Sequence, residues 1–429
     1  MLIESVSATV DTSPTEWKRT GPDYLVYRPS SPSGDDGYND HFLVEVTPGG
    51  ALLAVWMQGS REGAPDLRVV ASRSGDRGLA WSAPQVIADD GGEPGRVAWA
   101  GFPVVSTAGR IYCFYHKNMG LTDGGHYFTG VLRCAYSDDD AQTWAQSGVD
   151  IPFRRTRLDH PDSTIPCKCV VWQKPIRDAK GRWLVGFTRW SSVVVFPPPA
   201  HGFHFDSSAE LMRFENLDEG PHPRDVRITW LPEGDARLRV ACPIDPERSR
   251  GYSLCEEPSL VLLPDGRLFM VLRTVTGRIW YTVSEDGGRS WRPAKVLRVR
   301  DGGDEVLHPK APCPVYALRD GRFLLFFHNH DGYGGGARGP WDLDGRRPLY
   351  VAVGAFRSTA HQPVWWSQPK RVCDTDGVPI GPQARVWLAM YASLTEHGGR
   401  RVLWYPDRKH FLLGRLLPDP WLNGLEVPS

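Results

Sequence analysis

Residues 252–291 contain the pattern that decides the fold: Tyr252-Ser-Leu-Cys-Glu-Glu-Pro-Ser-Leu-Val-Leu-Leu-Pro-Asp-Gly-Arg-Leu-Phe-Met-Val-Leu-Arg-Thr-Val-Thr-Gly-Arg-Ile-Trp-Tyr-Thr-Val-Ser-Glu-Asp-Gly-Gly-Arg-Ser-Trp291. Turn residues separate three apolar runs in this stretch, at 260–263, 268–272 and 279–283. Short apolar runs between such turns predict antiparallel strands joined by hairpins. The stretch therefore predicts an antiparallel meander with charged residues at its strand edges, namely Glu256, Glu257 and Arg273.

The turn in this stretch recurs along the chain. A glycine, usually followed by arginine, precedes a near-continuous apolar run at Gly50, Gly109, Gly181, Gly266, Gly321 and Gly399. An unbroken apolar run is typical of a strand buried on both faces between neighbouring sheets. Six such hairpins predict an all-β protein with the architecture of a six-bladed β-propeller. We expect one domain over residues 1–429, with 1–38 as an N-terminal arm or rim segment.

A second repeat has the pattern Ser-x-Asp-x-Gly-x-Thr-Trp. It occurs at residues 74–81, 137–144 and 284–291, with Ala141 in place of the glycine in the second copy, and a decayed copy lies at 358–365. The pattern predicts a tight turn in which the aspartate caps backbone amides and the glycine takes a positive φ. Each copy follows a predicted hairpin, so the repeat supports the propeller and says little about activity.

Composition restricts the partners. The chain has 50 basic and 50 acidic residues, which argues against nucleic acid or an anionic membrane as the main partner. No apolar run is long enough to span a membrane, and the first residues lack the features of a signal peptide, so we expect a cytoplasmic protein. The eight scattered cysteines are interpreted as buried free thiols. We expect no cofactor.

The predicted inner strands place polar side chains at one rim of the central funnel. Seven residues after each turn glycine lie Met57, His116, Thr188, Arg273, His328 and Pro406. Equivalent positions in successive blades approach the same rim. Two histidines and an arginine directly after apolar strands indicate a polar site, and we expect His116 and His328 to contact a substrate there.

The two repeats resemble those of the sialidase (neuraminidase) family, whose propellers carry this turn, called the Asp box. The resemblance runs from about residue 42 to 413. It implies a glycosidase with a tyrosine nucleophile paired with a glutamate, an aspartate acid/base and three arginines that hold the substrate carboxylate. Glu257 and Arg273 match the family's Glu-x-x-x-Val-x-Leu-x-Asp-Gly and Arg-x-x-x-Gly patterns, and the segment around Tyr391 resembles the one that carries the nucleophile.

The remaining matches are looser. The resemblance implies that Arg346, with Arg347 as an alternative, is a carboxylate-binding arginine, and that Asp66 is the acid/base. Where the family begins its first inner strand with an arginine, this chain has Asp40 followed by His41. Arg28 could supply the lost charge.

The expected activity follows from these residues. A tyrosine nucleophile suits a substrate with a carboxylate beside the reacting carbon, because a carboxylate nucleophile would be repelled. We therefore predict a retaining exo-glycosidase of sialidase type that acts on a terminal acidic sugar, with specificity altered at Asp40 and His41, which could bind sugar hydroxyls.

Two alternatives stay open. One is a polysaccharide lyase or other acidic-glycan enzyme on the same fold, with four histidines as candidate bases: His41, His116, His328 and His330. The other is a glycan-binding propeller without catalysis, favoured by the missing arginine. His328 and His330 could share a metal ion, but no third ligand accompanies them, and we predict no metal site.

Overall fold

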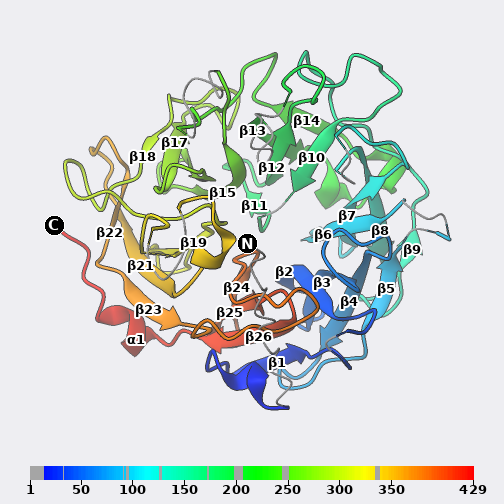
Figure 1. The fold of residues 1–429 in the computed structure, drawn as a ribbon, viewed down its shortest axis with the longest axis horizontal. Helices are drawn as coiled ribbons and strands as arrows, with labels where there is room; N and C mark the ends of the chain where they lie inside the picture. The colour runs from blue at the N-terminus through cyan, green and yellow to red at the C-terminus, as the bar shows by residue number, and fades with distance from the viewer. Residues whose placement is uncertain are drawn as a thin grey trace, which may run out of the picture.

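The computed structural model describes residues 14–31, 33–89, 91–92, 96–124, 128–171, 173–197, 206–243, 251–333 and 339–429. Six antiparallel sheets are arranged around a common centre (Figure 1). The predicted all-β, six-bladed β-propeller is therefore confirmed. Part of the predicted arm, residues 1–13 and residue 32, lies outside the described residues.

The first three blades follow the chain order. Blade 1 consists of β2 (Tyr38–Val46), β3 (Leu52–Gly59), β4 (Arg68–Ser74) and β5 (Gln85–Ala88). Blade 2 consists of β6 (Ala98–Val105), β7 (Ile111–Asn118), β8 (Gly130–Ser137) and β9 (Ala145–Gln146). Blade 3 consists of β10 (Lys168–Val171), β11 (Ile176–Arg177), β12 (Trp183–Trp190), β13 (Ser207–Phe214) and β14 (Ile228–Leu231).

The last three blades complete the ring. Blade 4, the meander of the opening stretch, consists of β15 (Glu256–Leu262), β16 (Leu268–Arg273), β17 (Trp280–Ser284) and β18 (Lys295–Val296). Blade 5 consists of β19 (Val315–Ala317), β20 (Phe323–Phe327), β21 (Leu349–Phe356), β22 (Val364–Trp366) and β23 (Lys370–Cys373). Blade 6 consists of β24 (Ser393–His397), β25 (Arg400–Asp407), β26 (Phe411–Leu416) and β1 (Tyr24–Tyr27).

Helical elements are few and short. They are the 3-10 turns η1 (Glu16–Lys18), η2 (Leu217–Glu219), η3 (Pro223–Asp225) and η4 (Leu343–Gly345), and the helix α1 (Asp419–Asn423). Among the described residues, no helix has the length and apolar character needed to cross a membrane.

The ring closes by pairing the two ends of the chain. Strand β1 lies antiparallel to β26 and forms the outer edge of blade 6, beside blade 1 (Figure 1). Tyr24 packs on Trp404 with ring centroids 5.4 Å apart. Residues 24–27 of the predicted rim segment are thus a structural part of the last blade.

Both sequence repeats form the predicted turns. The six turn glycines have φ values from 74° to 94°. In the third Asp box, the Asp286 carboxylate accepts hydrogen bonds from Ser284 Oγ and Ser290 N, both at 2.9 Å. Ala141, in the second box, takes the left-handed conformation (φ 63°) that glycine takes in the other two. The decayed copy forms the turn before β22, at the equivalent place in blade 5.

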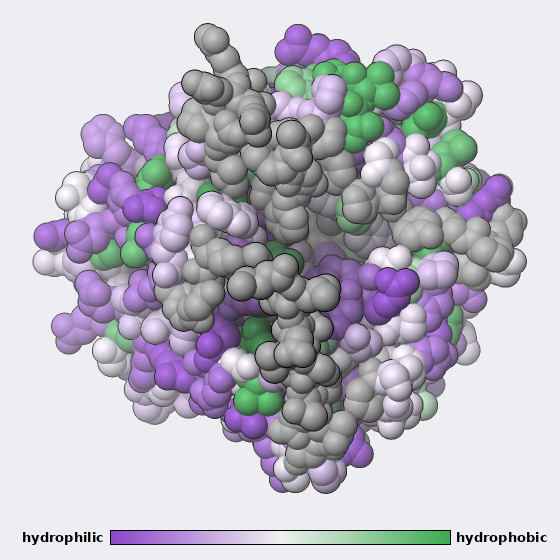
Figure 2. Space-filling model, viewed as in Figure 1, coloured by the Kyte–Doolittle hydropathy of each residue, from purple (hydrophilic) through white to green (hydrophobic). Residues whose placement is uncertain are grey.

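Apolar side chains fill the space within and between the blades. The middle strands are the most buried, and all five residues of β20 and all six of β16 are inaccessible or nearly so. The surface seen in Figure 2 is mainly hydrophilic where residues are coloured. The unbroken apolar runs therefore mark strands that are buried on both faces, as the sequence predicted, and in the structure these are the second strands of their blades.

Three inner strands have the same irregularity. Strands β2, β6 and β15 each contain a bulge near the rim, and one bulge residue takes a positive φ: His41 (50°), Ala100 (55°) and Glu257 (46°). A bulge interrupts the alternation of side chains along a strand and redirects them. These bulges lie at the end of the funnel where the predicted site residues gather.

Candidate active site

Tyr391, Glu257 and Arg273 form a hydrogen-bonded group. The Tyr391 hydroxyl donates to Glu257 Oε1 at 2.8 Å, and Arg273 Nη1 donates to the Tyr391 oxygen at 3.1 Å and to the same carboxylate oxygen. Glu257 belongs to β15, Arg273 ends β16, and Tyr391 precedes β24. Blades 4 and 6 thus bring together three residues that the sequence predicted to act together.

The backbone of the β15 bulge is hydrogen-bonded to the neighbouring blade at Glu257. The Glu257 backbone N–H donates to Thr188 Oγ1 of blade 3 at 2.7 Å. Glu257 is 4% exposed, and within the described residues its Oε2 has no hydrogen-bond partner. One carboxylate oxygen therefore holds the phenol, while the other is available to a further donor.

Tyr391 is protonated at neutral pH in this environment. Burial raises the pKa of its phenol well above the usual value, and the Glu257 charge raises it further, while Arg273 and Arg346 lower it. The phenol consequently donates its proton to Glu257 as a hydrogen bond. Charge development on the phenol oxygen would be stabilised by the two arginines.

Arg346 follows η4 and is the second predicted arginine in the site. Its Nε donates to the carbonyl of Lys310 at 3.0 Å, and its guanidinium lies over the ring of Trp387 at 4.7 Å. Burial lowers its pKa to about 10, with the charge of Arg273 acting in the same direction. Arg347, the alternative, points instead to Asp374, with Nε 2.8 Å from Oδ1.

Asp40 lies at the corner where an arginine was expected, and a lysine lies beside it. Lys409 Nζ, from the β25–β26 turn, is 2.8 Å from Asp40 Oδ2 and 2.7 Å from Glu62 Oε1. The Asp40 carboxylate is fully buried and also accepts from the Tyr38 hydroxyl at 3.1 Å. Arg28 is elsewhere, since it donates to the carbonyl of Pro14 on the surface. Lys409 therefore supplies the cation at this corner.

The loop after β3 carries two carboxylates with different environments. Asp66 accepts hydrogen bonds from Ser60 N at 3.0 Å and Ser60 Oγ at 3.1 Å, so it braces its own loop. Glu62, which the sequence analysis did not select, reaches Lys409 and forms an ion pair with Arg385. Burial raises the pKa of the Glu62 carboxyl, but the charges of Lys409 and Arg385 lower it by more, and the resulting pKa is about 2.

The predicted histidines differ in their relation to Tyr391. The His41 ring packs on the Tyr391 ring with centroids 4.2 Å apart, and burial lowers its pKa to about 4. His116 accepts a hydrogen bond from the Trp99 indole, and Trp99 in turn packs on His41. His328 stacks on His308 and bonds to the carbonyl of Pro348 at 3.0 Å. Of these three histidines, His41 is the one whose contacts described above include a catalytic candidate.

The described residues contain no group of three or more His, Cys, Asp or Glu side chains arranged to hold a metal ion. His330, like His328, hydrogen-bonds a backbone carbonyl, since its Nε2 lies 3.1 Å from the carbonyl oxygen of Arg347. All eight cysteines are free thiols.

Sequence comparison identifies the family of this propeller. The BNR repeat-like domain family matches residues 50–406, which is most of the chain. The chain belongs to the BNR repeat-like domain family. No curated protein sequence matches it.

Several solved structures share the fold of this BNR repeat-like protein. An intramolecular trans-sialidase from Ruminococcus gnavus is 14% identical, with a TM-score of 0.60 over 93% of this chain and 98% of that one. The NanB sialidase from Streptococcus pneumoniae is 12% identical, with a TM-score of 0.59 over 94% of this chain and 71% of that one. A protein of unknown function from Dyadobacter fermentans is 13% identical, with a TM-score of 0.58 and coverage of 92% and 97%. These similarities confirm the sialidase-like propeller fold.

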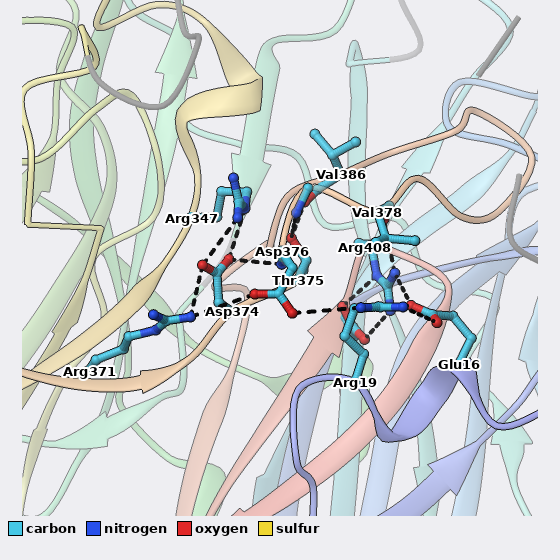
Figure 3. Close-up of polar contacts among 12 residues, drawn as sticks. Glu16, Arg19, Arg347, Arg371, Asp374, Thr375, Asp376, Val378, Val386 and Arg408 are labelled. Carbon is cyan, nitrogen blue, oxygen red and sulfur yellow. Dashed lines mark hydrogen bonds and ion pairs between the residues drawn. The ribbon is translucent and has the colours of Figure 1, made fainter. Parts of the chain in front are cut away.

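The BNR repeat-like protein holds its site with a segment in which the sequence predicted a role for Tyr391 alone. Residues 374–391 carry Arg385, Trp387 and Tyr391, and an ionic network anchors their first half (Figure 3). In that network Asp374 binds Arg347 and Arg371, and Arg408 donates to the carbonyl of Val378 at 3.0 Å. Trp387 then lies against three cations, with its centroid 4.7 Å from Arg346, 4.6 Å from Arg385 and 5.3 Å from Lys409.

Proposed function

We propose that this protein is a retaining glycoside hydrolase that removes a terminal acidic sugar, with Tyr391 as nucleophile. The observation that carries the proposal is the contact of 2.8 Å between the Tyr391 hydroxyl and Glu257, with Arg273 bound to both. A phenol buried against a carboxylate can be deprotonated as it attacks, and the carboxylate is the base.

The reaction would proceed in two steps. The Tyr391 oxygen attacks the anomeric carbon and gives its proton to Glu257, while a loop carboxylate protonates the departing glycosidic oxygen. Water, deprotonated by that same loop carboxylate, then attacks the anomeric carbon, and Tyr391 leaves and recovers its proton from Glu257. Glu62 and Asp66 are the candidates for the loop carboxylate, because both lie on the loop after β3.

The charges around Tyr391 favour an acidic substrate. Arg273 and Arg346 present guanidinium groups, which bind carboxylates through paired, charge-assisted hydrogen bonds. Asp40, at the position where the family has a third arginine, forms an ion pair with Lys409 at 2.8 Å, so its negative charge is compensated. A sugar carboxylate held by this set of cations would lie beside the phenol oxygen, and a neutral nucleophile there avoids repulsion between like charges.

The test is hydrolysis of a panel of aryl ketosides of acidic sugars, together with aryl glycosides of uncharged sugars. Wild-type protein should release the aryl group from at least one acidic member, and Tyr391→Phe should lower kcat by about 10³-fold or more. Tyr333→Phe is the matched control, because Tyr333 is 64% exposed. Full turnover by Tyr391→Phe would exclude the mechanism. Tight binding of acidic sugars without turnover by wild-type protein would instead support a glycan-binding propeller.

A lyase is the second candidate, and the position of His41 favours it. Its ring lies 4.2 Å from that of Tyr391, and with a pKa of about 4 it is neutral at pH 7 and able to accept a proton. A lyase acting on an acidic glycan would remove the proton beside the carboxylate and expel the glycosidic oxygen, which leaves an unsaturated sugar. The ultraviolet absorbance of an unsaturated uronate among the products would support this activity, and its absence during cleavage would support hydrolysis.

A further inference from the structure

Two consecutive glutamates bind one guanidinium. Arg273 contacts Glu257 through Nη1, and its Nε lies 3.4 Å from Glu256 Oε2. Adjacent residues of a regular strand point to opposite faces of the sheet. The bulge at Glu257, with its φ of 46°, removes that alternation and lets both carboxylates reach Arg273. Of the two glutamates, Glu257 is the one that hydrogen-bonds Tyr391 among the described contacts, whereas Glu256 faces other partners.

Glu256 connects Arg273 to a buried lysine. Its Oε2 lies 3.3 Å from Lys310 Nζ, and its Oε1 accepts from the Trp190 indole at 3.1 Å. The backbone carbonyl of Lys310 accepts from Arg346 Nε at 3.0 Å. Lys310 is therefore linked to both arginines of the site. It is linked to Arg273 through the Glu256 carboxylate and to Arg346 through its own backbone carbonyl. Glu256 is 3% exposed and Lys310 is 6% exposed.

We propose that Lys310 is a positioning residue whose positive charge keeps Arg273 on Glu257 and Tyr391, and that loss of this charge sets the upper pH limit for binding an acidic ligand. The inference takes the acidic ligand from the proposed function. It adds a residue outside the catalytic candidates, Lys310, whose protonation determines the pH range in which Arg273 can bind an acidic ligand.

The charges around Lys310 explain the direction of the effect. Burial lowers the pKa of its ammonium to about 8, while Glu256 raises it and Arg273 lowers it. Glu257 from the same strand raises it further, and Arg346 binds the carbonyl. His308, two residues earlier, is neutral, because burial lowers its pKa to about 3. Below pH 8 the ammonium and Arg273 share the charge of Glu256.

Above pH 8 Lys310 loses its proton, and of the two cations that pair with Glu256 among the described residues only Arg273 keeps its charge. The guanidinium is then drawn toward Glu256 and away from Glu257 and Tyr391. The site also loses one positive charge. Both changes weaken the binding of a carboxylate.

The test measures binding rather than turnover. The probe is a 2,3-didehydro-2-deoxy sugar acid, titrated by calorimetry from pH 6 to pH 9.5, with its methyl ester as a neutral comparison. For wild-type protein we expect Kd to be constant below pH 8 and to rise by up to about tenfold per pH unit above it, as binding linked to one proton requires. Lys310→Arg should remove this rise, because arginine keeps its charge across this range. Lys310→Met should bind weakly at every pH.

Controls separate a positioning role from a structural one. Lys370→Met, at a lysine that lies 4.3 Å over Trp421 and outside the site, should keep the wild-type profile. If Lys310→Met does not fold, Lys310→Arg decides the question. A rise in Kd for Lys310→Arg with the wild-type midpoint would overturn the inference, as would failure of wild-type protein to bind the probe. Binding with the expected profile but without turnover would overturn only the proposed hydrolysis.

Discussion

Glu62 and Asp66 lie on one loop, and the identity of the general acid depends on which of them reaches the glycosidic oxygen. Glu62 is an anion in the free site, because Lys409 and Arg385 hold its pKa at about 2. It could act as an acid only after a substrate carboxylate takes over Lys409. Asp66 needs no such exchange, but its carboxylate is bound to Ser60. The sequence favours Asp66, and its role as the acid/base remains a prediction.

Leaving-group dependence distinguishes the two carboxylates. Removal of the general acid should lower kcat/KM by about 10²- to 10⁴-fold for a poor leaving group and much less for an activated aryl group. Glu62→Gln and Asp66→Asn, assayed with an alkyl and a nitrophenyl glycoside, form a matched pair. The variant that loses activity only on the alkyl glycoside identifies the acid. Equal losses on both substrates in both variants would exclude the loop as its source.

Asp40 and Lys409 should be energetically coupled. Asp40 is fully buried, so Lys409→Met leaves a carboxylate without its cation, which typically costs about 3–5 kcal/mol. Removing both charges often costs less than removing one. We therefore expect the double variant Asp40→Asn/Lys409→Met to unfold at a higher temperature than Lys409→Met alone. Additive losses in thermal unfolding would show that the pair acts independently.

At the scale of elements, the segment 374–391 depends on the network in Figure 3. Asp374 is the centre of its first part, with two arginine partners and a side chain 7% exposed. Asp374→Asn should cost about 2 kcal/mol and lower kcat, because Tyr391 and Trp387 lose a fixed support. Asp376→Asn is the control, since Asp376 is 59% exposed and its arginine partners are 3.6 and 3.7 Å away. Urea unfolding and steady-state kinetics of both variants check this, and equal effects would contradict it.

Elements with a local cause were predictable from sequence. Inner strands and Asp boxes depend on apolar runs, turn glycines and capping aspartates, which are visible within a few residues. Glu257 and Arg273 were predicted because they lie at the ends of such strands and match the sequence patterns of the sialidase family. Glu62, Lys310 and Lys409 were not, since each is one charged residue in a loop among many. Their roles arise from ion pairs between segments far apart in the chain, and no local pattern marks these.

The arrangement of the whole ring was predictable as a count of blades, but its closure was not. Repeated hairpins indicate how many blades there are, whereas the pairing of β1 with β26 joins residues 24–27 to 412–414 without any repeated motif. The same limit applies to the site. Blade 4 supplies Glu257 and Arg273, blade 6 supplies Lys409, and Tyr391 enters blade 6, so only the complete ring assembles them.

Ring closure should therefore control activity as well as stability. Tyr24 and Val26 of β1 are 5% and 8% exposed, and loss of their burial corresponds to about 3–6 kcal/mol. Deletion of residues 1–27 would also expose the edge of β26 and the ring of Trp404. Tyr24→Ala, which keeps the strand but loses the contact with Trp404, should have a smaller effect.

Urea titrations followed by tryptophan fluorescence, circular dichroism and turnover test this dependence. In wild-type protein the three transitions should coincide, because blades 4 and 6 must meet to place Tyr391 on Glu257. In the deletion variant, activity should be lost at urea concentrations where circular dichroism still reports β-structure, since five blades have their strands while the sixth is incomplete. Wild-type stability and turnover in the deletion variant would show that β1 covers the edge of blade 6 without closing the ring.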